Sequence, residues 1–382
     1  MTKLLGQHHL YQILCRLGKG TLLILLVAGS AFWLWDESGM PASPKCKNQA
    51  QAIPSSLSYD HQLIQPNLQT GQMKPSFPSL EISSRAGFGL SDQADPHYWS
   101  GQLNAGWYLD WKAEQRRNFQ YPEHWQMVRF FRGCVIPSRD ATRWLVLHYP
   151  GKVWIIGNEP DVIAQDAVTA EQYAQAYHDL YYLIKSTDPT ALVAVAGVAQ
   201  PSPLRLEYLD NVLAAYQNSY HEQMPVDWWT VHGYVLREER DSWGVDIPPG
   251  MAPDQGQLYE IEDHGRKDLF NQQIQAFRSW MAKNGYRQVP LALTEFGILM
   301  PADYGFPTSI KQQYLRDTFQ WLATATDETT GFPQDGNRLV QRWAWFSLSD
   351  SLLPDGNLAD LEALELTSIG QAFRDFVSGY QP

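Results

Sequence analysis

Two glutamates stand directly behind short apolar runs, where a strand of a folded core would end. Glu159 follows Val153–Ile156 in the stretch "GKVWIIGNEPD", and Glu295 lies near the end of "VPLALTEFG" (289–297). A pair of carboxyl groups can cleave a glycosidic bond, one donating a proton to the leaving oxygen and the other acting on the sugar carbon. This chemistry requires that the fold bring the two side chains, far apart in the sequence, to opposite sides of one linkage.

The strands that carry these glutamates belong to an alternating pattern of short apolar runs and helical segments. Four helices are predicted at 169–189, 267–285, 309–326 and 364–377, with Thr169 as an N-cap and Gly285 as a C-cap. The segments between the early strands are short or irregular. The eight predicted strands are 87–91, 105–111, 127–133, 152–158, 191–198, 226–234, 289–297 and 341–348.

Eight such units predict an α/β protein with a (β/α)8 TIM barrel, and the alternative is an open doubly wound sheet. The absence of a glycine-rich phosphate fingerprint after the early strands argues against the dinucleotide-binding form of that sheet. In a barrel of this kind the active site lies at the C-terminal ends of the strands. Glu159 would end the fourth strand there, and Glu295 the seventh.

Composition and charge narrow the class of ligand. The chain has 382 residues, of which 44% are hydrophobic, so it can bury a sizeable core. Its net charge of −12 argues against a nucleic-acid partner, which requires clustered Lys and Arg. The 15 Trp are compatible with a sugar-binding site, because flat ring faces pack against the C–H faces of sugars, but rings also fill cores.

No metal or cofactor is expected. The three cysteines, Cys15, Cys46 and Cys134, form no CxxC or Cys/His cluster. His221, His232 and His264 have no spacing that recommends a ligand set. Cys46 and Cys134 could pair if the chain is exported, or could be two unrelated thiols.

The N-terminal region has the charge arrangement of an export signal. Residues 21–35, "TLLILLVAGSAFWLW", carry no charge, with basic residues before them and acidic residues after them. We expect an uncleaved anchor (residues 1–36), a Pro/Ser/Gln-rich stalk (37–85) and a catalytic domain (86–382) on the extracytoplasmic side of the membrane. Cleavage near Ala28 and Ser30, giving a secreted protein, is the alternative.

The "GNEP" that closes the fourth strand and the "TEFG" that closes the seventh resemble the catalytic motifs of the clan A glycoside hydrolases. This resemblance implies a TIM barrel and a retaining mechanism without cofactor. It implies that Glu159 is the general acid/base and Glu295 the nucleophile, and that Asn158 binds the sugar 2-hydroxyl. Residues 235–266, which are long and acidic, have no counterpart that we can align.

The same resemblance assigns further substrate-binding residues. His232 and Tyr234 end the sixth strand, where clan members place groups that touch the nucleophile, although His232 alone is more often structural. Trp345 resembles the aromatic platform under the sugar, or could be core, and Arg129, with Arg132 competing, resembles an arginine that binds the nucleophile. The motif "GWYLDW" resembles a tryptophan-rich strand of small endo-β-glucanase-like groups and indicates Trp107 and Asp110.

Several residues have simpler interpretations, and Trp154 is better explained as core. Asp161 and Asp227 are expected to be solvated or structural, whereas Trp243 and Tyr259 would touch substrate if the 235–266 segment forms a lid or a subsite wall.

Two hypotheses of function follow. The first is a retaining glycosidase or transglycosidase that attacks a β-linked glycan, with endo action favoured. The second is a tethered glycan-binding barrel without turnover, which the presence of both glutamates argues against. A metal-dependent barrel hydrolase is more distant, because no convincing ligand set is found.

Overall fold

The computed structural model describes residues 81–115, 121–131 and 134–380. All eight predicted strands are present, each shorter than the apolar run that predicted it. The first four along the chain are β1 (Ala86–Gly89), β2 (Trp107–Leu109), β4 (Gln126–Phe131) and β6 (Val153–Ile156). The other four are β7 (Leu192–Val195), β8 (Trp229–His232), β9 (Leu291–Phe296) and β10 (Arg342–Trp345).

The strand pairings place these parallel strands in ring order. One sheet has the order β3-β2-β1-β10-β9-β8 and the other the order β5-β4-β6-β7. A parallel bridge between Ala194 and Trp228 joins β7 to the start of β8. On the other side, β3 (Glu123–His124) pairs with β2 and leads directly into β4, while β5 (Cys134–Ile136) is antiparallel to β4. This is the order of a (β/α)8 barrel.

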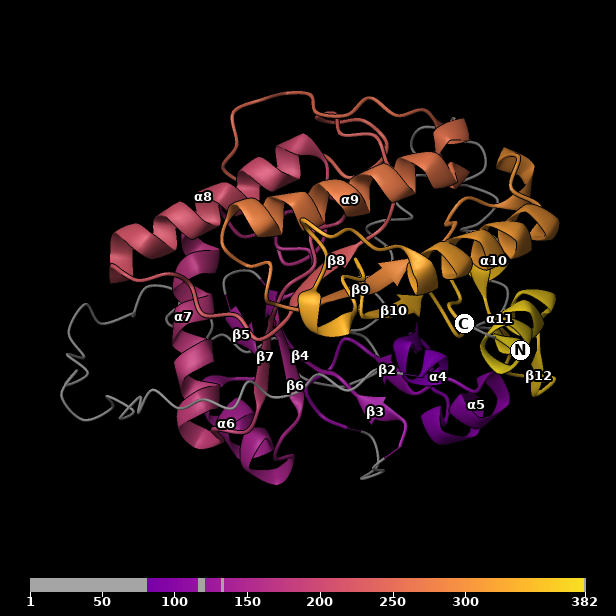
Figure 1. The fold of residues 1–382 in the computed structure, drawn as a ribbon, viewed down its shortest axis with the longest axis horizontal. Helices are drawn as coiled ribbons and strands as arrows, with labels where there is room; N and C mark the ends of the chain where they lie inside the picture. Colours follow the sequence, from indigo (N-terminus) through magenta and orange to yellow (C-terminus); the bar gives the residue numbers. More distant parts are fainter. Residues whose placement is uncertain (1–80, 116–120, 132–133, 381–382) are drawn as a thin grey trace, which may run out of the picture.

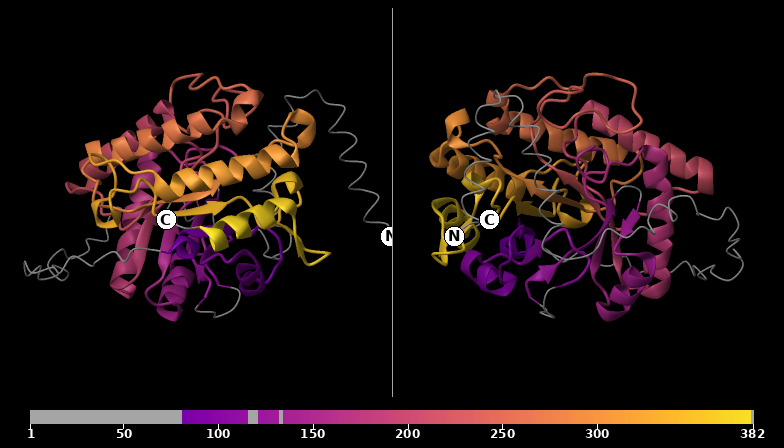
Figure 2. Two further views of the ribbon diagram at one scale, coloured as in Figure 1. Left: turned by 45° about the vertical axis from the view of Figure 1, so that its right-hand side comes forward. Right: turned by 180° about the vertical axis from the view of Figure 1, so that it is seen from behind.

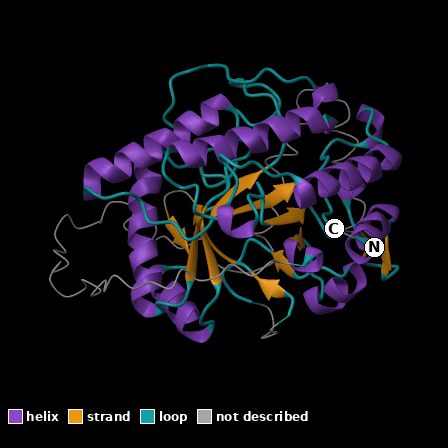
Figure 3. Cartoon of the chain, viewed as in Figure 1, coloured by secondary structure: helices purple, strands orange, loops and turns teal. Residues whose placement is uncertain are grey.

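Helices surround the strands, as Figure 1 and Figure 3 show. The four predicted helices are α7 (Ala170–Thr187), α9 (Lys267–Lys283), α10 (Thr308–Thr324) and α11 (Ser368–Gly379). Thr169 caps α7 in a full capping box with Gln172. Gly285 follows α9 with φ +86°, a backbone conformation that favours glycine. The helices that were not predicted are α4 (Ile82–Arg85), α5 (Pro96–Leu103), α6 (Arg139–His148) and α8 (Pro203–Tyr220).

The remaining elements are short. A two-stranded antiparallel ribbon, β11 (Ala359–Asp360) with β12 (Glu365–Leu366), precedes α11. The 3-10 helices are η1 (Ile261–Gly265), η2 (Ala302–Tyr304), η3 (Pro333–Asp335) and η4 (Pro354–Gly356). The 235–266 segment runs from β8 to α9 largely without regular structure, and in Figure 2 it lies at the outside of the molecule near α8 and α9.

The strands form the centre of one continuous apolar core. Every residue of β6 is buried, including Trp154, which confirms the interpretation of Trp154 as core. Strands buried on both faces are typical of parallel sheets covered by helices. The backbone that carries Glu159 is thereby fixed by packing before any interaction of its side chain.

The domain begins a few residues earlier than predicted. Residues 82–85, assigned to the stalk from the sequence, form α4, and Arg85 is buried. Its guanidinium is ion-paired with Asp335 at 2.6 Å, so α4 is tied to the far end of the chain. The sequence missed this because four residues carry no periodicity that predicts a helix.

The expected anchor and most of the stalk lie outside the described residues. In the described ranges, no helix has the length and apolar character required to cross a membrane. Cys134 is buried, whereas Cys46 lies outside these ranges, so the pairing of the two remains a prediction.

Candidate active site

The structure brings Glu159 and Glu295 together, with His232 between them. One carboxylate oxygen of each glutamate and a ring nitrogen of His232 all lie within 4.8 Å of one another, and the three side chains are buried. Glu159 follows β6 and Glu295 belongs to β9, both at the C-terminal ends of their strands. Retaining glycosidases hold their two carboxyl groups about 5–5.5 Å apart, whereas inverting enzymes leave roughly 6.5–9.5 Å for a water molecule. The short separation found here fits the retaining arrangement.

Glu159 is held by its backbone as well as by its side chain. Its φ of +44° lies in the left-handed region, which is uncommon for a residue with a side chain. The Glu159 amide donates to the Gly197 carbonyl at 3.0 Å, which fixes the end of β6 to the end of β7. Strained backbone that surrounding contacts maintain is concentrated at functional sites.

His232 contacts both carboxyl groups. Its Nδ1 lies 2.8 Å from Glu159 Oε1 and its Nε2 lies 3.4 Å from Glu295 Oε1. A register shift between Val231 and His232, in the pairing of β8 with β9, places His232 beside Glu295. The ring also occupies the space above Gly197, where an added Cβ would come within 2.6 Å of it. A side chain at position 197 would therefore displace the imidazole.

Two further donors converge on Glu295. The Trp111 indole donates to Oε1 at 2.6 Å, and the Tyr234 hydroxyl donates to Oε2 at 3.2 Å. Trp111 reaches the site because its φ is +54°, directly after β2. Gly89 leaves room for the indole, since an added Cβ there would lie 2.8 Å from the Trp111 ring. Donors on both oxygens favour the ionised form of Glu295.

Burial governs the proton affinities at the site. Desolvation raises the pKa of Glu159 from 4.5 to about 7, although Arg205 and Arg129 act in the opposite direction. Burial also raises the pKa of Glu295, opposed chiefly by His232. Burial lowers the pKa of His232. Near neutral pH this arrangement favours a protonated Glu159 beside a neutral His232.

The comparisons with known proteins agree with this geometry. Residues 87–243 match the family model described as "Glycosyl hydrolase catalytic core". That match supports a glycoside hydrolase. The matched segment contains Glu159 and His232 but ends before Glu295. A search of curated proteins finds no match.

Solved structures share the fold at low identity. A GH128 (subgroup II) endo-β-1,3-glucanase from Sorangium cellulosum aligns with a TM-score of 0.54 and 17% identity, over 78% of this chain and 99% of its own. A GH128 (subgroup III) curdlan-specific exo-β-1,3-glucanase from Blastomyces gilchristii, in complex with glucose, gives 0.53 and 17%, over 77% and 99%. A subgroup I enzyme from Amycolatopsis mediterranei, an endo-β-1,3-glucanase in complex with laminaritriose, gives 0.51 and 16%, over 76% and 98%.

Asn158 has an unused acceptor next to Glu159. Its backbone amide donates to Asp166 Oδ2 at 2.7 Å, which fixes the residue in place. Its side-chain Oδ1 is buried and has no hydrogen-bond partner in the described part of the chain. Leaving a buried acceptor unsatisfied costs free energy, so such an atom is suited to bind a ligand hydroxyl.

Arg129, predicted to bind the nucleophile, is hydrogen-bonded to Asp166 and Gln165 instead. Its Nε donates to Asp166 Oδ1 at 2.7 Å and its Nη2 to Gln165 at 3.0 Å, and no hydrogen bond to Glu295 is found among the described residues. Asp166 also receives the amides of Phe130 and Asn158, so Arg129 supports the loop that follows Glu159. Arg132 lies outside the described residues.

Trp345 packs into the core instead of forming a platform. It is fully buried, lies 5.5 Å from Phe296 between ring centroids, and donates to the Gly356 carbonyl. Trp343, two residues earlier, packs likewise on Phe319 of α10. Trp343 and Trp345 are two residues apart, so their side chains share one face of β10, and this face packs against the helices. Phe346, the next residue, packs edge-on against Trp111, with ring centroids 5.6 Å apart, and Trp111 in turn contacts Glu295.

Trp107 and Asp110 are also buried away from the carboxyl pair. Trp107 is fully buried, packs on Trp125 at 4.8 Å and donates to the Arg85 carbonyl. Asp110 is ion-paired with His124 at 2.8 Å, with both side chains fully buried. Within the motif "GWYLDW", the residue that contacts Glu295 is the last one, Trp111, and not Trp107 or Asp110.

The remaining expectations concern loops and metals. Trp243 packs against the apolar core and Tyr259 is half-buried, and neither has a recorded contact with the carboxyl pair among the described residues. Asp161 is buried and structural, as one of the simpler interpretations held.

Within the described ranges, Glu159, His232 and Glu295 are the residues whose ligand atoms lie close enough to hold a metal ion. Both nitrogens of His232 already face these carboxylates, an arrangement that also serves acid–base chemistry.

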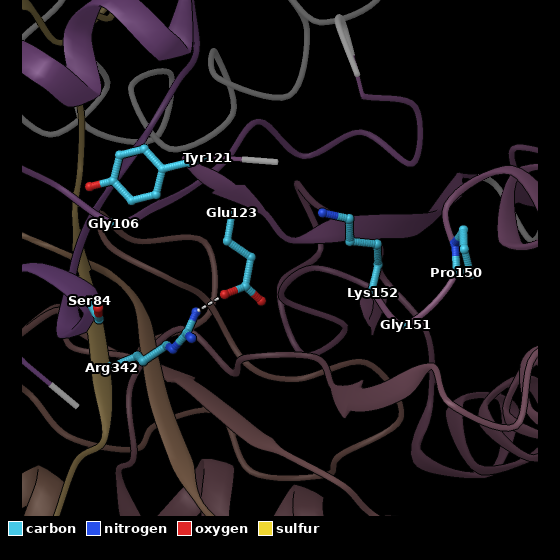
Figure 4. A pocket seen from close by; sticks show the side chains of 8 residues that line it. All are labelled: Ser84, Gly106, Tyr121, Glu123, Pro150, Gly151, Lys152 and Arg342. Atoms are coloured by element: carbon cyan, nitrogen blue, oxygen red, sulfur yellow. Dashed lines mark hydrogen bonds and ion pairs between the residues drawn. The ribbon is translucent and has the colours of Figure 1, made fainter. Parts of the chain in front are cut away.

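A pocket of about 380 Å³ opens at the opposite end of the barrel. Figure 4 shows its lining, with Glu123 bonded to Arg342 and Lys152 on the other side of Glu123. Its residues precede or begin strands, so the pocket lies at the N-terminal ends, remote from Glu159 and Glu295. Residues at that end of such barrels serve stability rather than catalysis.

Proposed function

We propose that this protein is a retaining glycoside hydrolase of clan A that cleaves a β-glucan, with Glu159 as general acid/base and Glu295 as nucleophile. The observation that carries the proposal is the pair of buried glutamates, with oxygens within 4.8 Å, on either side of His232. That separation is closer to the roughly 5–5.5 Å of retaining enzymes than to the roughly 6.5–9.5 Å at which inverting enzymes accommodate a water molecule.

The protonation states suit the first chemical step. Glu159, whose pKa is raised to about 7, holds the proton that it gives to the leaving oxygen as the glycosidic bond breaks. Glu295 attacks the anomeric carbon and forms a glycosyl ester. In the second step Glu159, now ionised, takes a proton from water, and the hydroxide displaces Glu295 and restores both groups.

His232 gives these states a consistent hydrogen-bond pattern. A protonated Glu159 donates to Nδ1, and the Nε2–H of the neutral ring points toward Glu295. We assign this tautomer from the network, since the positions of the hydrogens follow from the partners. Trp111 and Tyr234 stabilise the negative charge on Glu295 before it attacks and after it leaves.

The substrate class rests on the comparisons. The similar structures are described as β-1,3-glucanases, and some were crystallised with laminari-oligosaccharides. We therefore propose a β-1,3-linked glucan as the substrate and cleavage within the chain as the mode of action. The free Oδ1 of Asn158 is placed to accept a hydrogen bond from the sugar 2-hydroxyl.

A polysaccharide substrate also fits an enzyme that segment 21–35 holds outside the cytoplasm. Membrane fractionation and the protease accessibility of the domain in intact cells would test this location.

A panel of β-linked polysaccharides tests the activity. We expect reducing ends to be released from laminarin or curdlan, as oligosaccharides of several lengths. Glu159→Ala and Glu295→Ala should each lower kcat by a factor on the order of 10³ or more. Azide should rescue only Glu295→Ala and yield a glycosyl azide of inverted configuration. Tight binding of the polysaccharide by the wild type with no released sugar would favour the glycan-binding hypothesis instead.

A further inference from the structure

Arg205 is a fully buried cation near the active site that the two-carboxylate mechanism does not use. It lies in the first turn of α8 and has no solvent exposure. Burying a guanidinium is costly unless it is paired and hydrogen-bonded. Its partners come from two different segments, namely the loop that carries Glu159 and the long 235–266 segment.

The first partner is Asp161, two residues after Glu159. Arg205 Nε lies 2.7 Å from Asp161 Oδ2, and both side chains are fully buried. The same carboxylate accepts the Ala199 amide at 3.2 Å, two residues after Gly197, whose carbonyl binds the Glu159 amide. Asp161 thus fastens the Glu159 loop to the end of β7 from one side, and Arg205 holds Asp161 in place.

The second group of partners belongs to the 235–266 segment. Arg205 Nη1 lies 2.7 Å from Glu238 Oε1, and Nη2 donates to the Val245 carbonyl at 2.6 Å and the Asp246 carbonyl at 3.2 Å. Glu238 in turn accepts from the Ser202 hydroxyl and the Gln257 amide. The guanidinium therefore binds the first part of this irregular segment directly and its later part through Glu238 and Gln257.

We propose that Arg205 is a positioning residue for Glu159, which locks the acid/base loop and the 235–266 segment into one rigid unit, so that the segment is a fixed wall and not a lid. The proposal rests on the proposed function, because it concerns the delivery of the proton by Glu159. Arg205 touches no reacting atom. Its effect passes through Asp161, whose displacement would shift Glu159 within its left-handed turn.

The dependence on the leaving group separates this role from general stability. A poor leaving group, such as the sugar hydroxyl of a glucan, needs the proton from Glu159, whereas a dinitrophenolate leaves without it. Arg205→Lys should therefore lower kcat/KM for laminarin by about 10–100-fold, a partial loss of the roughly 10²–10⁴-fold that general acid catalysis contributes. The same variant should change kcat/KM for dinitrophenyl β-laminaribioside by less than about threefold, and Glu159→Gln should show the same selectivity more strongly.

Arg278 provides the matched control. It is equally buried, lies on α9, and donates to the carbonyls of Thr330, Val289 and Arg287, which are remote from Glu159. Arg278→Lys should lose thermal stability but retain the wild-type ratio of activities on the two substrates. If Arg205→Lys does not fold, Asp161→Asn, which keeps the Arg205–Glu238 pair, should show the same selective loss.

The outcomes are distinct. A wild-type enzyme that hydrolyses neither substrate overturns the proposed function. An active wild type whose Arg205→Lys and Asp161→Asn variants lose both activities in equal proportion, like a merely destabilised protein, overturns the role of Arg205 alone.

Discussion

The acids at the two ends of the barrel differ in their partners: those at the N-terminal end face a guanidinium, whereas Glu159 and Glu295 at the C-terminal end face a histidine. At the N-terminal end, Arg85 and Asp335 form a two-pronged ion pair with distances of 2.8 and 2.6 Å, and Arg342 pairs with Glu123 at 2.6 Å. At the C-terminal end, Glu159 and Glu295 share one His232, whose own pKa is lowered by burial. The nearby cations Arg129 and Arg205 are already paired with Asp166 and Asp161.

This difference in the partners of the acids indicates that the C-terminal end of the barrel is less stable but more reactive than the N-terminal end. A cation beside a buried acid lowers the pKa of that acid and offsets part of the desolvation that burial imposes. A buried acid without a matched cation holds its proton to higher pH, which a general acid requires. The positive φ of Glu159 and of Trp111 also occurs at the C-terminal end. We therefore expect substitutions at the two ends to separate stability from activity.

The largest effect on stability is expected at the N-terminal end. Asp335→Ala leaves Arg85 buried without its carboxylate, and breaking such a pair costs about 3–5 kcal/mol of unfolding free energy. Urea denaturation measures this loss. At a temperature where the variant is folded, its kcat on laminarin should equal that of the wild type. A large fall in kcat with intact folding would contradict the separation of the two ends.

At the C-terminal end, removal of a charge should stabilise the protein. The raised pKa of Glu159 means that the wild type loses stability as the pH rises from about 4.5 to about 7, because the unfolded chain then releases this proton while the folded state keeps it. The loss amounts to about 3 kcal/mol at most. Glu159→Gln, inactive on glucan, should lack this decline, so its advantage in stability should be absent at pH 4, grow between about pH 4.5 and 7, and stay constant above pH 7. Parallel pH dependences of unfolding for the two proteins would count against the raised pKa.

A smaller effect is expected from the donors to Glu295. Trp111→Phe removes the 2.6 Å hydrogen bond but keeps an aromatic ring beside Phe346. A hydrogen bond to a charged group contributes about 1.5–3 kcal/mol, so kcat/KM should fall by roughly 10–100-fold. The bond lowers the pKa of Glu295, and its loss should move the acidic limb of the kcat/KM profile to higher pH. Trp144→Phe, at an exposed tryptophan of α6, is the control and should change neither quantity.

Much of the fold could be predicted because its signals are local. Each of the eight apolar runs and four periodic helices can be recognised within about 20 residues of sequence. The proximity of Glu159 and Glu295 follows from the order of the strands in a barrel. The helices α4 and α8 were not predicted. The role of Arg205, which lies on α8, was therefore not predicted either. The partners of Arg205 lie as far as 41 residues away in sequence, and no local sequence pattern extends over that distance.

The errors in the site have a common physical cause. Side chains at the end of a strand point alternately toward the active site and toward the helices, so a shift of one residue exchanges the two directions. The backbone conformation just after the strand can change the direction again. The pairing of β10 with β9 has a register shift between Trp343 and Trp345, and Trp111 leaves β2 in a left-handed conformation. The left-handed turn brings Trp111, and not Trp107, to Glu295, while alternation along β10 turns both Trp343 and Trp345 toward the helices. Bulges of this kind are frequent beside active sites, and composition does not reveal them.

The most direct measurement is the identification of the residue that becomes covalently bound to the sugar. Incubation of the wild type with an activated fluorinated β-laminaribioside, whose second step is slow, should trap a glycosyl-enzyme that peptide mass spectrometry can locate. The account predicts one sugar ester, on the peptide that contains Glu295, and none in Glu295→Ala. An ester on Glu159 or on another residue, or an active enzyme that forms no ester and releases product of inverted configuration, would contradict it.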